Sequence, residues 1–397
     1  FGFTFDNLDI DYSVAVRRSR KVSQRLTKGI EHLMKKNNID VYMGKARIQS
    51  INEVEMTQAN GKTTIITAEN IVVASGARPK TPEQFKIDNS KIVTYRDAIL
   101  QNQHPKSVVI IGGGAIGVEF ATIWNSYGSE VTIVEMMNNI LPMEDIEIST
   151  ELTRSLTKAG IRILKDSKVE EIDLEDQNVT IRISNKSGHS SIKAEQVLVA
   201  IGFTPNIEGL GLNAMGVKKD SQGFVQVNDS MSTNIENVYA IGDVTGKLLL
   251  AHVASAQGIV AAETIAGHPT IKLNYKMLPK ATYCYPEVAS FGYTESEAQE
   301  AGYNTRVSKF RFSANGKALS LGDHNGWIKI VSDDKHHDIL GAHMIGPQVT
   351  ELLPELSLAY NAELTAEDIA RNIHAHPTLS EAIMETAQGL VDKIIHS

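Results

Sequence analysis

One glycine-rich run has the spacing G-x-G-x-x-G, which is typical of loops that bind dinucleotides: Gly112-Gly113-Gly114-Ala115-Ile116-Gly117. It lies between a short apolar run, Val108–Ile111, and a helical pattern that continues through Val118 and Glu119 to about Tyr127. This strand–loop–helix context makes the motif specific. The first glycine allows a tight turn, the second lets the backbone approach a pyrophosphate, and the third allows close helix–strand packing. The amide hydrogens at the helix start can then bind the anion.

An acidic residue follows at the distance that a dinucleotide-binding fold requires. Glu135 ends the next apolar run, 23 positions after Gly112, where its carboxylate can accept hydrogen bonds from ribose hydroxyls. A carboxylate at this point repels a 2′-phosphate, and Met136 and Met137 provide no arginine that could bind one. The sequence therefore predicts NAD rather than NADP as the nicotinamide cofactor.

A second group of residues suited to chemistry lies near the carboxyl end, in the run His374-Ala375-His376-Pro377-Thr378-Leu379-Ser380-Glu381. A histidine with a carboxylate partner is the usual means of general acid–base catalysis near neutral pH. His376 precedes a proline, which favours an extended backbone and a ring that projects from a loop. Glu381, one turn into the next predicted helix, could fix the tautomer of that ring. Spacing alone favours equally a capping box, in which Glu381 binds an amide hydrogen instead.

The two histidines of this run could also suggest a metal site. No third ligand lies at a suitable spacing, so the pattern argues against zinc. We therefore predict no metal.

Composition excludes several classes of protein. The 397 residues carry a net charge of -8, which argues against a nucleic-acid partner and an anionic membrane surface. No apolar run approaches the roughly 18 to 20 residues that cross a bilayer, and the opening Phe-Gly-Phe-Thr-Phe has no features of a targeting segment. Cys284 is the only cysteine, so no disulfide or redox pair of thiols can form within the chain. We expect a reducing, cytoplasmic compartment.

Hydrophobic patterns indicate how the chain is organised. Residues 13–36 are predicted to form one basic amphipathic helix. The stretches Glu69–Pro79 and Glu195–Pro205 share a polar start, a buried strand, a glycine and a proline, which indicates two similar nucleotide-binding domains in tandem. The pattern after about Leu273 predicts the antiparallel strands Thr305–Phe312, Trp327–Ser332 and Ile339–Ile345. Helices are predicted to follow, from about Gln348 to Tyr360 and from Thr378 to the end.

Several motifs occur together in one order along essentially the whole chain. They are Ser75-Gly76-Ala77-Arg78-Pro79, the Gly112–Gly117 loop with Glu119 and Glu135, Gly202–Asn206, Thr233–Asp243, Leu249-Leu250-Ala251-His252 and His374–Glu381. In this order the chain closely resembles the flavoprotein disulfide reductases, and within them the dihydrolipoamide dehydrogenases. The resemblance implies an α/β fold with tandem Rossmann-like FAD and NAD domains and a carboxyl-terminal α+β dimerisation domain. The implied parts are residues 1–101 and 208–272 for FAD, 102–207 for NAD and 273–397 for dimerisation.

The resemblance also implies roles for single residues. Asp243 matches the acid that binds the FAD ribityl chain, and Leu249, Leu250, Ala251 and His252 match the turn and helix start that meet the flavin ring. Further matches are FAD contacts at Ala46, Ser75 and Gly76, NAD contacts at Val169 and Gly202, and Glu119 near nicotinamide and flavin. His376 and Glu381 match the catalytic dyad, which favours chemistry over the capping box. In the family this dyad completes the active site of the partner subunit, so a homodimer is implied.

Two departures from the family pattern matter. Phe203-Thr204 stands where many members carry arginines, at the edge of the cofactor domain. The larger departure is that family members begin with a glycine loop for the FAD pyrophosphate and a helix holding C-x4-C, and neither is present here. Cys284, in Tyr-Cys-Tyr-Pro, is expected to be a buried structural thiol.

The resemblance implies an NAD-dependent flavoprotein that oxidises protein-bound dihydrolipoamide, here as an amino-terminally truncated chain that is inactive by itself. Its expected partner is the lipoyl domain of a 2-oxoacid dehydrogenase complex or of the glycine cleavage system. Two alternatives stay open: another FAD/NAD(P) disulfide oxidoreductase, or a shortened NAD-binding protein without turnover. Glu135 argues against the NADP-linked members.

Overall fold

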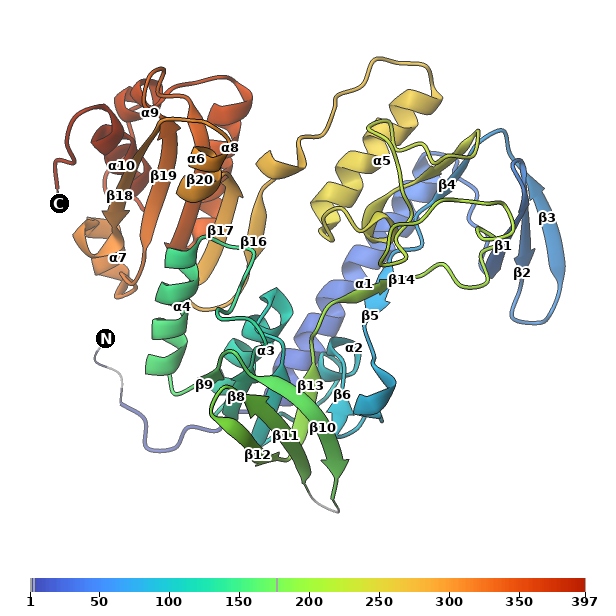
Figure 1. Ribbon diagram of the computed structural model, residues 1–397, viewed down its shortest axis with the longest axis horizontal. Coiled ribbons are helices and arrows are strands. Elements are labelled where there is room, and N and C mark those ends of the chain that lie inside the picture. The colour runs from blue at the N-terminus through green and yellow to red at the C-terminus, as the bar shows by residue number, and fades with distance from the viewer. Residues whose placement is uncertain (1, 3, 176–177, 397) are drawn as a thin grey trace. The chain divides into compact units, whose positions relative to one another are not determined.

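The computed structural model describes residues 2, 4–175 and 178–396. The chain forms two compact units, one from Phe1–Lys80 and Gly202–Tyr275, the other from Thr81–Ile201 and Lys276–Ser397. Each unit therefore consists of two stretches that are distant in sequence (Figure 1). The boundaries of the four segments that the resemblance implies stay a prediction. None of the helices in the described part of the chain combines the length and hydrophobicity that a membrane crossing requires.

The first unit begins with the long helix α1, Tyr12–Lys36, which confirms the helix predicted at 13–36. Asp11 caps it by accepting a hydrogen bond from the amide of Ser13. Apolar side chains recur along one stripe of α1 at helical spacing, yet they are exposed: Val22, Leu26, Ile30 and Leu33. The hydrophobic pattern thus predicted the helix correctly, although the apolar face of α1 is not buried within this unit.

The remainder of the first unit is built from short strands. An antiparallel sheet has the order β1-β2-β3, with the strands Lys45–Ser50, Glu53–Thr57 and Thr63–Thr67. Strand β4 (Ile71–Val73) pairs in parallel with β15 (Val238–Ala240), and β5 (Ala77–Pro79) pairs antiparallel with β14 (Phe203–Pro205). The two segments with the repeated pattern therefore meet through β5 and β14. The 3₁₀ turn η2 (Gly242–Thr245) and helix α5 (Ala251–Ile265) follow β15.

The second unit contains a parallel sheet of order β6-β13-β7-β8-β9. Its strands are Ile92–Val93, Gln196–Val199, Ser107–Ile111, Glu130–Val134 and Arg162–Leu164. The associated helices are α2 (Tyr95–Ala98), α3 (Ala115–Ser126) and α4 (Ile146–Lys158), and the 3₁₀ turn η1 is Glu83–Phe85. An antiparallel sheet of β10 (Lys168–Leu174), β11 (Val179–Asn185) and β12 (Gly188–Ala194) precedes β13. This is the expected dinucleotide-binding arrangement, with β7–α3–β8 as its opening βαβ unit.

The second unit also holds an antiparallel sheet of order β16-β17-β20-β19-β18. Its strands are Lys280–Thr282, Glu287–Gly292, Ile339–Gly346, Trp327–Asp333 and Thr305–Arg311. Helices α8 (Val349–Asn361) and α10 (Glu381–Val391) pack on this sheet, and α9 (Ala366–Arg371) packs on α10 (Figure 1). The remaining helices, α6 (Glu295–Glu300) and α7 (Gly316–Leu321), are short. The 3₁₀ turns are η3 (Tyr275–Met277) and η4 (Phe312–Ala314). Apolar side chains from this sheet and these helices form one buried core. An α+β fold results.

One sequence prediction about this region was wrong. The last helix was expected to run from Thr378 to the end, but α10 covers only Glu381–Val391. Beyond it the chain turns back, because the buried carboxylate of Glu385 accepts hydrogen bonds from the amides of Ile395 and His396. Local periodicity cannot reveal this contact.

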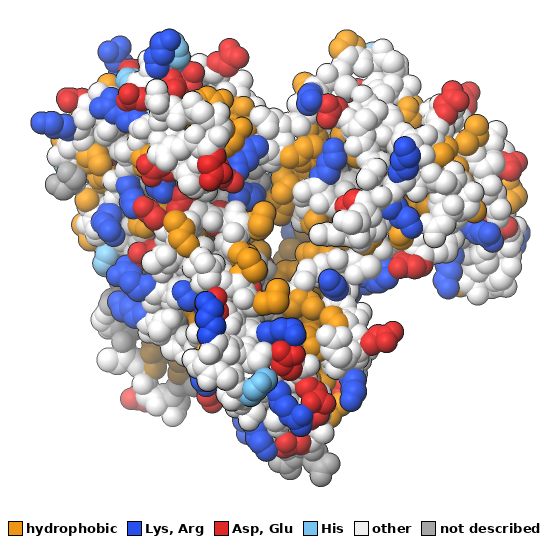
Figure 2. All heavy atoms as spheres, in the orientation of Figure 1, with side chains coloured by type: hydrophobic (Ala, Val, Ile, Leu, Met, Phe, Trp, Pro, Cys, Tyr) orange, Lys and Arg blue, Asp and Glu red, His pale blue; other side chains and the backbone are white. Residues whose placement is uncertain are grey.

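Charged side chains of both signs are interspersed on the face that Figure 2 shows. That face therefore offers no large continuous basic surface to a nucleic-acid backbone.

A buried ion pair joins the start of helix α4 to strand β19 in the second unit. The Lys329 Nζ on β19 lies 2.7 Å from the carboxylate of Asp145, and both side chains are almost fully buried. Asp145 caps α4 by accepting the amide hydrogen of Glu147. Burial raises the pKa of Asp145, but the hydrogen bonds from Lys329 and Glu147 outweigh burial and hold it below its usual range. Asp145 is therefore ionised and fully partnered at neutral pH.

We expect Lys329→Met to lower the free energy of unfolding by about 3–5 kcal/mol, because it leaves Asp145 as an unpaired buried charge. Both tryptophans, Trp124 and Trp327, lie in the second unit, so fluorescence during urea unfolding reports this loss. The pair contributes stability above the lowered pKa of Asp145, so the difference between variant and parent should shrink as pH falls toward that pKa.

The control for this experiment is Lys168→Met. Lys168 pairs with Glu170, and both side chains are substantially exposed. This substitution should change the free energy of unfolding by less than about 1 kcal/mol. Equal effects of the two substitutions at neutral pH would contradict the importance assigned to the buried pair.

Candidate functional site

The glycine loop that follows β7 has no room for side chains at the first and third glycines of the G-x-G-x-x-G motif. Gly112 has φ +106°, and a Cβ there would lie 2.3 Å from the carbonyl oxygen of Ala200. A Cβ on Gly117 would lie 2.0 Å from the carbonyl oxygen of Gly112. A Cβ on Gly114 would meet nothing within 4 Å. The first and third glycines are thus required by the fold, whereas the second faces open space.

Helix α3 begins at this open space. Its N-cap is Gly114, which has no side chain, and the first turn, starting with the exposed Ala115, holds no acidic residue. The amide hydrogens at a helix start carry partial positive charge and need acceptors. An anion at Gly114 would supply them, so the residues of this loop fit the pyrophosphate of a dinucleotide.

Glu135 lies at the mouth of the loop. Its carboxylate is buried and accepts hydrogen bonds from the amides of Gly113, at 2.6 Å, and of Met137, at 2.7 Å. A carboxylate has about four acceptor positions, so two amide contacts leave capacity for ribose hydroxyls. The structure also reveals a role that the sequence did not indicate, because Glu135 ties the loop to the end of β8.

The other residues expected to contact NAD differ in their surroundings. The side chains of Val118 and Val169 are buried in the interior, so any contact with a ligand would use their backbone. Ile116 is half-buried. Glu119 on α3 accepts a hydrogen bond from the amide of Tyr283, and burial raises the pKa of its carboxyl group more than this bond lowers it. Gly202 has φ +109° and belongs to the other unit.

The residues expected to contact FAD all lie in the first unit, on separate segments of the chain. Burial raises the pKa of Asp243, in turn η2, and within the described residues no group donates a hydrogen bond to its carboxylate. The hydroxyl of Ser75 is buried and likewise has no partner among the residues described. Gly76 has φ +70°, and nothing lies within 4 Å of the position of a Cβ.

Helix α5 begins directly after Leu249 and Leu250, at Ala251 and His252, and its N-cap Leu250 makes no side-chain cap. The unpartnered polar atoms and the uncapped helix start fit the polyol and ring of a flavin. Ala46 lies on β1 and is exposed. The chain contains a single G-x-G-x-x-G run, at Gly112. The residues of the first unit described above therefore fit only the ribityl chain and ring of FAD, not its pyrophosphate.

His376 and Glu381 contact each other directly. The Nδ1 atom of His376 lies 2.9 Å from Oε1 of Glu381, while Oε2 of Glu381 accepts the amide hydrogen of Thr378 at 2.7 Å. One carboxylate oxygen thus contacts the imidazole, and the other accepts the Thr378 amide hydrogen that the capping-box interpretation expected, but the capping box itself does not form. Thr378 is not the N-cap, because α10 begins at Glu381 itself. The His376 side chain is 78% exposed.

Surroundings hold the Glu381 carboxylate in its charged form. Burial raises its pKa, but hydrogen bonds from Thr378 and His376 lower it further, and the result lies below the usual range. The second histidine of the run serves a different purpose. His374 is buried and its Nε2 lies 2.7 Å from Glu355 on α8, a partner that spacing along the sequence could not identify.

Two further observations concern metals and thiols. Across residues 2, 4–175 and 178–396, no group of three or more His, Cys, Asp or Glu side chains is placed to hold a metal ion. Burial, assisted by the charge of Glu119, raises the pKa of the Cys284 thiol to about 12. The prediction that Cys284 is buried is confirmed.

Comparisons with known proteins agree with this geometry. Residues 5–258 match the family described as pyridine nucleotide-disulphide oxidoreductase, and residues 278–387 match its dimerisation domain. The chain belongs to the pyridine nucleotide-disulphide oxidoreductase family. Membership of this family implies FAD and NAD(H) as cofactors.

Individual relatives narrow the comparison. The chain is 45% identical to a dihydrolipoyl dehydrogenase of Mycobacterium leprae, a match that covers 100% of this chain and 85% of that protein. It is 41% identical to a dihydrolipoyl dehydrogenase of Corynebacterium glutamicum over 97% of this chain and 83% of the relative.

Solved structures share the fold. The crystal structure of LpdA from Mycobacterium tuberculosis superposes with a TM-score of 0.91 at 24% identity, covering 97% of this chain and 84% of LpdA. The HOCl-induced flavoprotein disulfide reductase RclA from Escherichia coli superposes with a TM-score of 0.87 at 25% identity, covering 96% of this chain and 86% of RclA. The predicted fold class is confirmed.

Gly114→Ala separates the ligand role of the loop from its structural role. Because a Cβ there meets nothing, the variant should keep its stability within about 1 kcal/mol. The new methyl group would occupy space next to the pyrophosphate, so we expect NADH to bind at least tenfold more weakly, or about 1.4 kcal/mol. Fluorescence titration with NADH measures this, and unchanged affinity would contradict the assignment of the loop. Gly117→Ala, by contrast, should destabilise the fold.

Proposed function

We propose that this chain serves a dihydrolipoyl dehydrogenase, which oxidises protein-bound dihydrolipoamide to lipoamide and passes the electrons to NAD⁺. The observation that carries the proposal is the exposed His376 paired with the charged Glu381, in a chain 45% identical to an enzyme of that name. An exposed, oriented imidazole suits proton transfer with a thiol that arrives from outside the subunit.

The tautomer of His376 follows from its partner. An ionised carboxylate can only accept hydrogen bonds, so the hydrogen between the two side chains belongs to Nδ1 of His376. Nε2 is then the unprotonated nitrogen and can take a proton. The positive charge that results remains in contact with Glu381, which stabilises it. The amide of Thr378 keeps the carboxylate in place throughout.

The cofactors would be held by residues of both units. The Gly112–Gly117 loop would bind the pyrophosphate of NAD and Glu135 its ribose, while Asp243 and the start of α5 would bind the ribityl and ring portion of FAD. When bound, FAD supplies the electron transfer between a dithiol and nicotinamide. The residues of this chain contribute binding and orientation.

A second candidate function is NAD binding without dithiol turnover. It is favoured by Cys284, which is the only cysteine and has a pKa raised to about 12. Two thiols cannot come from this chain, and a thiol so protonated is a poor nucleophile near neutral pH. A third possibility is a different flavoprotein disulfide reductase, of which RclA is an example. It has weaker support because this chain is only 25% identical to RclA.

The finer expectations about partners are also proposals. The matched dimerisation domain supports a homodimer in which His376 serves the active site of the partner subunit. The names of the relatives support docking of a lipoyl domain, which would come from a 2-oxoacid dehydrogenase complex or the glycine cleavage system. The single cysteine fits a cytoplasmic location.

A chimera tests the function directly. An amino-terminal segment with the glycine loop for the FAD pyrophosphate and the C-x4-C pair, as the resemblance to the family implies, would be joined to residues 1–397. We expect this protein to reduce NAD⁺ with dihydrolipoamide, whereas residues 1–397 alone bind NADH without turnover. In the chimera, His376→Gln should lower kcat by about 10²–10⁴ because the general base is lost. His374→Gln is the control for a histidine in the same run. A chimera that binds FAD and NAD but ignores dihydrolipoamide would contradict the proposal.

Glu381→Gln tests the tautomer without requiring turnover. The neutral amide no longer demands a hydrogen on Nδ1, so we expect the His376 ring to change from mostly Nδ1–H to a mixture of tautomers. The ¹⁵N shifts of the ring report this change. The matched control is Glu355→Gln, which should alter the signals of His374 and leave those of His376 unchanged. Identical His376 signals in parent and Glu381→Gln would show that Glu381 does not orient the ring.

A further inference from the structure

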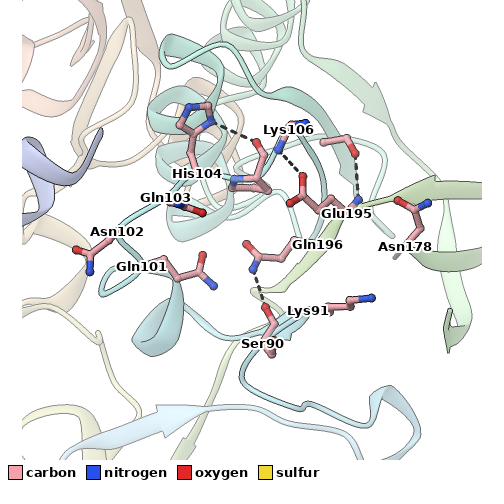
Figure 3. A pocket seen from close by; sticks show the side chains of 12 residues that line it. Ser90, Lys91, Gln101, Asn102, Gln103, His104, Lys106, Asn178, Glu195 and Gln196 are labelled. Carbon is pink, nitrogen blue, oxygen red and sulfur yellow. Dashed lines mark hydrogen bonds between the residues drawn. The ribbon is translucent and has the colours of Figure 1, made fainter. Parts of the chain in front are cut away.

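A polar cavity of about 880 Å³ lies in the second unit, away from the glycine loop (Figure 3). It is lined by the segment 101–107, which leads into β7, by Ser90 and Lys91 before β6, and by Glu195 and Gln196 at the start of β13. Apart from Pro105, every residue that lines it has a polar or charged side chain. Such a wall suits a small polar molecule rather than an apolar one.

The cavity is separate from the proposed NAD site. It lies at the amino ends of the parallel strands β6, β13 and β7, whereas the glycine loop and Glu135 follow the carboxyl ends of β7 and β8. Strand β7 has five residues, so the two ends lie roughly 16 Å apart. A ligand of the cavity would therefore not be the pyrophosphate bound at Gly114.

Gln196 presents an oxygen to the cavity that has no hydrogen-bond donor. Its side chain is buried, and its Nε2 donates to the carbonyl oxygen of Ser90 at 2.7 Å. That bond fixes the orientation of the amide, because exchanging the nitrogen and oxygen would bring two acceptors together. The Oε1 atom is buried and, within the described part of the chain, has no partner. Buried amide oxygens rarely remain without a donor.

Gln101 presents a second unpartnered carboxamide to the same cavity. Its Oε1 is buried without a donor, and no residue that the structure describes hydrogen-bonds with its Nε2. Figure 3 shows the amides of Gln101 and Gln196 pointing toward one another, Gln101 from the segment after α2 and Gln196 from the start of β13. Gln101 thus offers one donor and one acceptor side by side, and Gln196 offers one further acceptor.

The neighbouring charged groups are already engaged. The Nζ of Lys91 donates to the carbonyl oxygen of Glu175, and the carboxylate of Glu195 accepts the amide hydrogen of Lys106. The ring of His104 contacts Ser129 and the carbonyl oxygen of Pro105. The buried side-chain atoms of this lining that lack a hydrogen-bond partner are therefore the Oε1 atoms of Gln101 and Gln196.

We propose that this cavity is a binding site for a small molecule with a primary carboxamide group. A primary carboxamide has two N–H donors and one carbonyl acceptor. One N–H and the carbonyl can pair with the Oε1 and Nε2 of Gln101, and the second N–H can reach the Oε1 of Gln196. Both buried unpartnered oxygens then receive a donor, and Nε2 of Gln101 gains an acceptor. An anionic carboxylate lacks the N–H donors, and an amidinium lacks the acceptor that Nε2 of Gln101 requires.

The test uses acetamide as the probe and the complete chain, with ADP-ribose saturating the glycine loop. Saturation-transfer NMR should detect acetamide binding, with acetamidinium and acetate binding at least tenfold more weakly. Gln101→Leu and Gln196→Leu should each lower acetamide affinity at least tenfold. Gln222→Leu, at an exposed position of the other unit, is the matched control and should leave the affinity unchanged.

A variant with changed ligand preference distinguishes an altered binding site from a misfolded protein. Gln101→Glu places two acceptors where one donor and one acceptor stood, so this variant should prefer acetamidinium to acetamide. Absence of transfer to acetamide in the folded parent chain would overturn the proposal. The proposal would also be overturned if the Gln101→Leu and Gln196→Leu variants bound acetamide as tightly as the parent chain. The same holds for a crystal structure grown with acetamide in which the two amides contact only water or hydrogen-bond directly with each other.

Discussion

The second unit depends on a backbone contact at Gly112 that leaves no space for a side chain. A Cβ at this position would lie 2.3 Å from the carbonyl oxygen of Ala200. The amide of Gly112 donates to Val134, and the amide of Ala200 donates to Ile111, so the ends of β7, β8 and β13 meet at one point. The glycine loop leaves the sheet there, and the start of α3 is directed accordingly. Any ligand held by that helix start is positioned by this contact.

Four acidic side chains acquire different properties from their surroundings. Glu135 is fixed by two amides and Glu381 by an amide and an imidazole. Glu119 and Asp243 are desolvated with few or no donors, and burial raises their pKa. A carboxylate with donors stays charged and can orient another group, whereas one without donors is prepared to accept hydrogen bonds from a ligand. The same chemical group thus fixes a loop at Glu135 and an imidazole at Glu381, and in the proposed function Glu135 and Asp243 also bind cofactors.

Elements with strong local signals were predictable from the sequence. The strand at Ser107–Ile111 and the helix at Ala115–Ser126 agree with prediction to within a residue or two, because apolar periodicity and glycines determine both. Contacts between distant segments were not predictable. Spacing presented the partners of Glu381 as exclusive, although its two oxygens bind one each. The pairing of Lys329 with Asp145 and the turn that ends α10 depend on packing between elements, which local sequence does not encode.

The exposure of His376 bears on how the site is completed. The His376 side chain is 78% exposed, so in the proposed function it would compete with water for its proton and would act efficiently only when another surface covers it. Ile373, three positions before His376, is 94% exposed, and such an apolar side chain gains most from burial against a partner. Both residues lie within the segment that matches the dimerisation domain. Their exposure is what a half-site would require, with a fixed carboxylate and an oriented imidazole on one chain and the covering surface on a second copy.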